Sequence, residues 1–247
     1  MGKLNLITGD IIEQSIGMDA IVNSQNKYMS YGSGVCGAIY RAAGTEIINY
    51  CEENYNTYMQ DGEVRITPGF NLNMDIIHIL APRAYEHKDD SIEVLLNAYQ
   101  NTLEEIKNKN YKKVILPSLG AGIHGYEHQD IAKPVITLLN DFCSNSDTEL
   151  YLINMYPVYT NIYFEELVSI KNIDLKNDLL DLEVNKIISY LKNNNLYIDN
   201  VDALYENFVS DKKLEYMCLY EKVICLQYCI EKLNVNKEDL LPLIDSL

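Results

Sequence analysis

The amino-acid sequence predicts an α/β sandwich followed by a helical C-terminal region. Residues 1 to about 165 alternate short apolar runs with amphipathic segments of helical length, a pattern typical of strands buried on both faces of a sheet. After about Asn161 the pattern changes, because residues 158–247 contain no glycine and a single proline, Pro242. We therefore expect residues 1–170 to form an α/β domain, and residues 171–247 to form an acidic helical domain or an extension of the first.

The expected strands are short apolar runs separated by polar or glycine-containing turns. Runs this short and this apolar favour strands that are covered on both sides rather than strands with one wet face. The candidates are Lys3–Ile7, Ala20–Val22, Glu63–Thr67, Ile76–Leu80, Val114–Leu116 and Leu150–Asn154.

The expected helices have apolar residues at helical spacing. In the first part of the chain they are Val35–Ala43, Thr45–Asn54, Ser91–Asn108 and Gln129–Phe142, with Ser91 as an N-cap. Because Pro134 favours the first turn of a helix, we expect the fourth of these to begin near Lys133. The C-terminal candidates are Leu175–Asn193, Val201–Val209, Lys212–Leu233 and Lys237–Ile244.

The composition limits the classes of partner. The net charge of −16 argues against nucleic acid as the main partner and against an anionic membrane surface. No apolar run approaches the roughly 20 residues of a membrane span, and no secretory segment precedes the first strand, so we expect a cytoplasmic protein. The six cysteines include no C-x-x-C pair, and Cys218, Cys225 and Cys229, which have helical spacing, are expected to be structural residues on an apolar face.

Residues 23–44 are the most informative segment. The strand at Ala20–Val22 leads into two amides, Asn23 and Asn26, and then into a glycine-rich loop that opens a helix ending at Gly44. Backbone N–H groups in such a loop can approach a ligand closely, and a helix N-terminus attracts negative charge. This segment therefore predicts a site for a phosphate or pyrophosphate group.

Three segments in order resemble the macrodomain family, whose members bind ADP-ribose and in many cases hydrolyse ADP-ribosyl linkages. Residues 23–44 are similar to its first ligand loop, residues 6–11 to its opening strand, and residues 117–126 to its second ligand loop. The resemblance covers roughly residues 1–165 and implies a three-layer α/β/α sandwich. It does not extend to the helical C-terminal region.

The resemblance implies that Asp10 accepts a hydrogen bond from the adenine amino group and that Ile11 offers a backbone N–H. The alternative for Asp10 is to cap a short helix, which aspartate also does. An aromatic residue near the end of the last strand would cover the adenine face. Tyr156 and Tyr159 both fit this position, and the alternative for either is a surface or interdomain tyrosine.

The first loop would hold the distal ribose and the diphosphate. The resemblance makes Asn26 the residue that places the ribose and a water, with Asn23 beside it; the alternative is that both amides only stabilise a turn. The residues of the predicted cradle are Gly32, Ser33, Gly34, Val35 and Cys36. Cys36 departs from the pattern, because hydrolases of one branch carry an aspartate there, and a thiol cannot serve as that carboxylate at neutral pH. Arg41 is expected to be structural.

The second loop would close over the diphosphate. Its predicted ligand-binding residues are Ser118, Gly120, Ala121, Gly122, Ile123, Gly125 and Tyr126. His124 lies where relatives place an aromatic residue over the distal ribose, and it could stack there or transfer protons. His124 and His128 are four residues apart, but Gly125 interrupts the helix that a zinc site would need, so we assign no metal and no cofactor.

The favoured function is hydrolysis of a mono-ADP-ribosyl linkage on protein by water attack at the distal ribose, with Asn26 and His124 as the catalytic candidates. The expected partner is ADP-ribose or an ADP-ribosylated macromolecule. Two alternatives stay open: a non-catalytic reader of ADP-ribose, which Cys36 favours, and a deacetylase of O-acetyl-ADP-ribose. A nucleotide-binding enzyme of another type is disfavoured, because the sequence lacks the G-x-G-x-x-G and G-x-x-x-x-G-K-[ST] motifs.

Overall fold

The computed structural model describes residues 1–87, 91–233 and 235–247. Contacts divide the chain into two compact units, one of residues 1–4 and 9–154 and the other of residues 5–8 and 155–247. This division falls after Asn154, earlier than the boundary expected at residue 170, because the segment that follows Asn154 groups with the C-terminal helices. The units are defined by contacts alone, and two separate domains with that boundary stay a prediction.

A mixed six-stranded sheet forms the centre of the fold, as the sequence predicted. Its order is β1-β6-β5-β2-β4-β3, and β2 pairs in parallel with both β4 and β5, while β3 runs antiparallel to β4. The side chains of Ile21, Ile76 and Ile115 in the central strands are fully buried, which explains their continuous apolar sequence. The strands are β1 (Lys3–Thr8), β2 (Ala20–Ser24), β3 (Val64–Thr67), β4 (Asp75–Ile79), β5 (Lys113–Pro117) and β6 (Glu149–Asn154).

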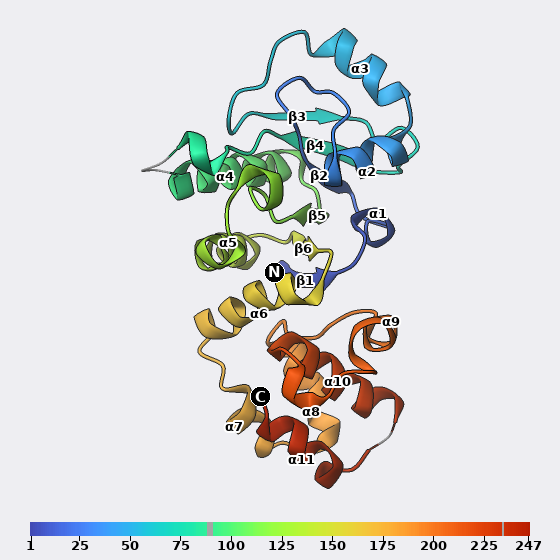
Figure 1. Cartoon of the computed structure of the whole chain (residues 1–247), viewed down its shortest axis with the longest axis vertical. Coiled ribbons are helices and arrows are strands. Elements are labelled where there is room, and N and C mark those ends of the chain that lie inside the picture. The colour runs from blue at the N-terminus through green and yellow to red at the C-terminus, as the bar shows by residue number, and fades with distance from the viewer. Residues whose placement is uncertain (88–90, 234) are drawn as a thin grey trace. The chain divides into compact units, whose positions relative to one another are not determined.

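Helices of the first unit cover both faces of this sheet, with α4 and α5 on one side of the strands and α1 and α2 on the other (Figure 1). This arrangement confirms the predicted three-layer sandwich. The helices are α1 (Ile11–Gln14), α2 (Gly34–Ala43), α3 (Glu46–Asn54), α4 (Ser91–Lys109) and α5 (His128–Ser144), and two 3-10 turns, η1 (Ala84–Glu86) and η2 (Gly122–His124), lie in the loops.

Helix α5 begins earlier than the sequence predicted. It starts at His128 rather than near Lys133, so Pro134 lies inside the helix. A proline there removes one backbone hydrogen bond and costs roughly 3 kcal/mol in a helix interior. The helix forms nonetheless because Ile131, Val135 and Leu139 are fully buried on one face, and the burial of three such side chains contributes more than that cost.

The second unit is helical. Its helices are α6 (Pro157–Ile170), α7 (Leu175–Leu180), α8 (Val184–Asn193), α9 (Val201–Leu204), α10 (Leu219–Lys232) and α11 (Lys237–Asp245), with a single π-helical turn at Tyr205–Val209 and a 3-10 turn at Leu214–Tyr216. The sequence analysis missed α6, although Pro157 at its first position is a recognised start signal. In the core of this unit the rings of Phe164 and Tyr220 pack edge to face with centroids 5.4 Å apart.

Two predicted C-terminal helices are shorter than expected. The helix predicted over 175–193 is interrupted between α7 and α8, where the Lys237 ammonium donates to the carbonyl groups of Leu179 and Leu182 at 2.6 Å each. These bonds satisfy carbonyls that a continuous helix would have bonded internally. The helix predicted over 212–233 begins only at Leu219, because Cys218 and Glu221 form a capping box at its start.

Candidate functional site

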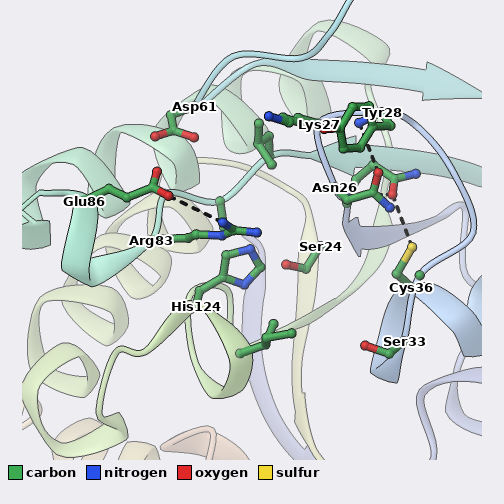
Figure 2. Close-up of a pocket in the computed structure, with 15 residues that line it drawn as sticks. Ser24, Asn26, Lys27, Tyr28, Ser33, Cys36, Asp61, Arg83, Glu86 and His124 are labelled. Atoms are coloured by element: carbon green, nitrogen blue, oxygen red, sulfur yellow. Dashed lines mark hydrogen bonds and ion pairs between the residues drawn. The ribbon is translucent and has the colours of Figure 1, made fainter.

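Six of the predicted site residues line one cavity where the parallel strands end: Asn26, Gly32, Ser33, Cys36, Ile123 and His124. The carboxyl ends of β2, β4 and β5 lie side by side, and the loops that follow them enclose a cavity of about 300 Å³ (Figure 2). In open α/β sheets this edge is the usual place for a ligand. The lining residues are Ser24, Gln25, Asn26, Lys27, Tyr28, Gly32, Ser33, Cys36, Asp61, Leu80, Ala81, Arg83, Glu86, Ile123 and His124.

Gln25 fixes the first loop to the body of the fold. Its side chain is 1% exposed; Oε1 accepts from the backbone N–H of Asn26 at 2.7 Å and from the Cys36 thiol at 3.2 Å. Its Nε2 donates to the Tyr40 hydroxyl at 2.7 Å, and Tyr40 in turn donates to the Met29 carbonyl at 2.8 Å. One buried amide therefore joins the end of β2, the loop and helix α2.

Asn26 lines the cavity, and its side chain also holds the loop. Oδ1 accepts from the backbone N–H of Tyr28 at 3.0 Å and from the Ser30 hydroxyl at 3.1 Å, while Nδ2 donates to the Ser30 carbonyl at 2.7 Å. The turn-stabilising alternative is therefore present in the structure. An amide nitrogen has two hydrogens, so Nδ2 retains one donor beyond the bond to Ser30. The predicted catalytic role of Asn26 stays a prediction.

A second buried network lies beneath the loop, around a histidine that the sequence analysis did not select. Nδ2 of Asn23 lies 3.0 Å from Nδ1 of His78, and the Thr67 hydroxyl lies 3.0 Å from the opposite ring nitrogen. Burial lowers the pKa of His78 to about 3, so its ring is neutral. Asn23 is fully buried within β2, which places its side chain in this network rather than on the cavity surface.

Cys36 contributes a thiol to the cavity. Burial raises the pKa of Cys36 above its usual value, while the hydrogen bond from Asn23 acts in the opposite direction. The thiol donates to Gln25, so it is a protonated donor near neutral pH rather than a thiolate. The structure thus agrees with the expectation that Cys36 cannot replace a catalytic carboxylate.

The cradle residues 32–35 surround the start of α2. Gly32 and Ser33 line the cavity, and α2 begins at Gly34, so the backbone N–H groups of its first turn are available at this end. The Ser33 hydroxyl makes no capping bond to the residues that the structure describes. A Cβ atom at Gly37 would lie 2.5 Å from the Gly32 carbonyl oxygen, so only glycine lets the loop lie this close to the helix. This end of α2 is therefore able to bind an anion.

The second loop is fixed at its two ends. The Tyr99 hydroxyl accepts from the Leu119 backbone N–H at 2.8 Å, and the Tyr126 hydroxyl donates to the Ser91 carbonyl at 2.7 Å. A Cβ atom at Gly120, whose φ is +84°, would lie 2.8 Å from a Leu95 methyl carbon. Tyr126 is buried and supports the loop. Of the predicted residues of this loop, only Ile123 and His124 line the cavity.

Ser118 and the remaining loop residues do not line the cavity. The Ser118 hydroxyl donates to Oδ1 of Asn154 at 2.9 Å, at the adjacent ends of β5 and β6. Ala121 begins the 3-10 turn, Gly122 lies within it, and Gly125, with a φ of +84°, ends it. Their predicted contacts with a ligand stay predictions.

His124 stands at the apex of the second loop. Figure 2 shows its imidazole beside the guanidinium of Arg83. Partial burial lowers the pKa of His124, and Arg83 lowers it further, whereas Asp61 and Glu86 raise it. The net direction is downward, so the ring is neutral near pH 7 and can accept a proton or a hydrogen bond at this position.

Asp10 and Ile11 belong to helix α1. Oδ1 of Asp10 accepts from the backbone N–H groups of Ile12 at 2.8 Å and Glu13 at 3.3 Å, so the capping alternative is present. Both bonds use the same oxygen, which leaves Oδ2 out of the cap. Tyr156 and Tyr159 belong to the second unit, where they are 55% and 41% exposed. The predicted adenine contacts of these four residues stay predictions.

Several cavity residues were missed by the sequence analysis. Four are charged, and they come from three different loops: Lys27, Asp61, Arg83 and Glu86. Arg83 and Glu86 form an exposed ion pair at 3.4 Å, and such pairs contribute little to stability. Gln25 offered one signal, since it stands between the two asparagines that the sequence analysis selected.

Among the residues that the structure describes, no cluster of three or more His, Cys, Asp or Glu side chains is arranged to hold a metal ion. Within the same residues, no helix is both long enough and apolar enough to cross a bilayer.

A family model and related proteins from other organisms match the α/β part of this chain. Residues 22–135 match the family model described as Macro domain. An O-acetyl-ADP-ribose deacetylase of Salmonella typhimurium is 31% identical over 167 residues, which cover 66% of this chain and 86% of the relative. An uncharacterised protein of Fusobacterium nucleatum is 35% identical over 169 residues, covering 65% of this chain and 94% of the relative.

Solved structures show the same fold. A mutant macrodomain of Oceanobacillus iheyensis with ADPR superimposes with a TM-score of 0.63 at 31% sequence identity. The match covers 68% of this chain and 92% of that one. The Oceanobacillus protein with ADP gives a TM-score of 0.62 at 32% identity, covering 67% and 90% of the two chains.

Proposed function

This chain belongs to the Macro domain family, and from that premise we propose that it binds ADP-ribose and hydrolyses mono-ADP-ribosyl linkages on protein. The observation that carries the proposal is the meeting of two glycine-rich loops at one cavity, with the N-terminus of α2 open to it. An ADP-ribose diphosphate has the charge that this helix end attracts. The similar Oceanobacillus structure with ADPR supports the choice of ligand.

In this mechanism the two loops bend the diphosphate around the start of α2. The distal ribose would lie toward Asn26 and Cys36, and the free N–H of the Asn26 amide would place the ribose and the attacking water. Cys36 as a protonated thiol and His124 as a neutral imidazole supply no strong base. Catalysis would therefore come from positioning and from a phosphate oxygen of the substrate that orients the water.

Two other activities use the same cavity. Deacetylation of O-acetyl-ADP-ribose is supported by the names of several relatives, including the Salmonella protein at 31% identity. Non-catalytic binding of ADP-ribose is supported by the protonated thiol of Cys36 where a catalytic carboxylate would be expected.

The test joins calorimetry with ADP-ribose to an assay that measures ADP-ribose released from a mono-ADP-ribosylated protein. Wild type should bind and release, and Asn26→Ala should lose about 100-fold or more in turnover, the effect of removing one positioned donor. Thermal unfolding of the variant would report any loss of the turn. Asn108→Ala, exposed at the end of α4, is the control.

Each outcome selects one function. Binding without release would identify a reader, and release of acetate from O-acetyl-ADP-ribose alone would identify the deacetylase. Full activity in Asn26→Ala would contradict the mechanism, and absence of binding would contradict the ligand.

A further inference from the structure

Four exposed tyrosines lie in loops that contribute residues to the cavity, and one of them, Tyr28, lines it. Tyr28, Tyr31, Tyr58 and Tyr85 are 57%, 51%, 66% and 61% exposed. We call these four residues the tyrosine rim. They come from three loops that are distant in sequence, and the proposed reaction uses none of them.

Contacts hold the first half of the rim in place. The rings of Tyr28 and Tyr58 meet edge to face with centroids 5.1 Å apart, and the Lys27 ammonium lies 5.0 Å from the Tyr28 ring. The two loops are joined by the backbone N–H of Met59, which donates to the Lys27 carbonyl at 2.9 Å. Both rings are therefore ordered although more than half of each is exposed.

Hydrogen bonds from two arginines hold the other two tyrosines of the rim, Tyr31 and Tyr85. Arg41 donates to the Tyr31 hydroxyl at 2.6 Å, and Arg83 donates to the Tyr85 hydroxyl at 2.9 Å with its guanidinium 5.9 Å from the ring. Side chains that are already ordered lose less conformational entropy when a partner binds. The rim is thus an aromatic surface that should lose little conformational entropy when a partner binds.

The rim is continuous with the cavity wall. Lys27 and Tyr28 line the cavity directly, and so do Arg83 and Glu86 on either side of Tyr85 (Figure 2). A group attached to a ribose near Asn26 would leave the cavity close to Tyr28, which also lines it. The tyrosines are therefore placed to contact whatever carries the nucleotide rather than the nucleotide itself.

We propose that the tyrosine rim binds the polypeptide to which ADP-ribose is attached. This inference rests on the proposed function. Tyrosine and arginine are the residues most enriched where proteins recognise proteins, since each offers a large contact area with a polar end. A nucleic acid fits less well, because the chain has a net charge of −16, and at the cavity Lys27 and Arg83 are balanced by Asp61 and Glu86.

The test uses two rim residues that do not line the cavity. Tyr58→Ala combined with Tyr85→Ala should raise the Kd for a mono-ADP-ribosylated protein about tenfold, the effect typical of losing one or two interface anchors. The Kd for free ADP-ribose should change less than about twofold. Tyr216→Ala, which removes a tyrosine 72% exposed in the second unit, is the matched control.

Binding is measured apart from turnover, so the two proposals fail separately. If no substrate is hydrolysed, the ratio of the two Kd values still tests the rim. An equal loss of affinity for modified protein and free ADP-ribose would overturn the inference, and so would no loss for either. A rim-dependent gain in affinity for an ADP-ribosylated single-stranded oligonucleotide instead of a protein would also overturn it.

Discussion

The loop after β2 and the loop after β5 reach the same cavity, but they are held differently. In the first loop, residues 25–33, buried side chains of Gln25 and Tyr40 bond to the middle of the loop. In the second loop, residues 118–126, bonds from Tyr99 and Tyr126 fix the two ends, and Ile123 at the apex is 81% exposed. We therefore expect the first loop to set the geometry of the site and the apex of the second loop to adapt to the ligand.

The largest effect should come from the buried amide of the first loop. Gln25→Leu keeps the approximate volume but leaves the Asn26 N–H and the Cys36 thiol without their acceptor. We expect the free energy of unfolding to fall by about 2–4 kcal/mol, and the Kd for ADP-ribose to rise more than about tenfold. Denaturant titration and calorimetry measure both.

The control is Gln100→Leu, because Gln100 is exposed on α4. If the two variants proved equally stable, the first loop would not depend on its buried amide, and the contrast between the loops would be lost.

The pH dependence of stability should report the network under the first loop. A buried histidine whose folded pKa is about 3 contributes stability above its unfolded pKa, and this contribution is lost as pH falls from about 6.5 toward 3. Relative to His78→Gln, wild type should lose about 2 kcal/mol of unfolding free energy between pH 7 and pH 5. If the unfolding free energies of the two proteins changed equally with pH, the pKa of His78 would not be lowered by folding, and this prediction would be wrong.

Alanine substitutions at two glycines should show that the base of the second loop is more tightly packed than its apex. Gly120→Ala and Gly122→Ala both place a side chain at positive φ, which costs roughly 1–2 kcal/mol. Only at Gly120 would the Cβ atom also meet Leu95 and Tyr126, at 2.8 and 2.9 Å, whereas Gly122 has open space. Thermal unfolding should rank Gly120→Ala as clearly less stable. The reverse order would place the rigid part at the apex.

The smallest effect should come from the apex itself. His124→Ala removes a partly buried ring that lines the cavity at the apex of the second loop. We expect the unfolding free energy to change by less than about 0.5 kcal/mol, and the Kd for ADP-ribose to rise only about threefold. A loss as large as that of Gln25→Leu would mean that the second loop is as fixed as the first.

Features that depend on neighbouring residues could be predicted from the sequence, whereas contacts between distant segments could not. The six strands and the glycine-rich start of α2 could be inferred, because each depends on neighbouring residues in the chain, whereas the raised pKa of Cys36 comes from burial in the fold. His78 could not be placed, because its contacts arise when β2 pairs with β4 and brings together residues 55 apart, as with Asn23 and His78. Gln25 was missed because its bonds to Cys36 and Tyr40 form only when helix α2 packs against β2. The four charged residues that line the cavity were missed because they come from three loops that are separate in the sequence.

The errors in the predicted helices have causes outside the local sequence. Pro134 was taken as a helix start although it lies inside α5, because burial of one helix face overrides a weak local preference. The interruption after α7 depends on Lys237, which lies 58 residues beyond Leu179 and could not be read from the sequence around the break.

The strand order has a kinetic consequence. The central strand β2 lies between β4 and β5, so both of its partners are made after it and both pairings close long stretches of chain. Parallel contacts between distant segments form slowly. During refolding, most of the cavity wall is assembled only when these two pairings are complete. ADP-ribose added during refolding should therefore be captured only after both pairings have formed.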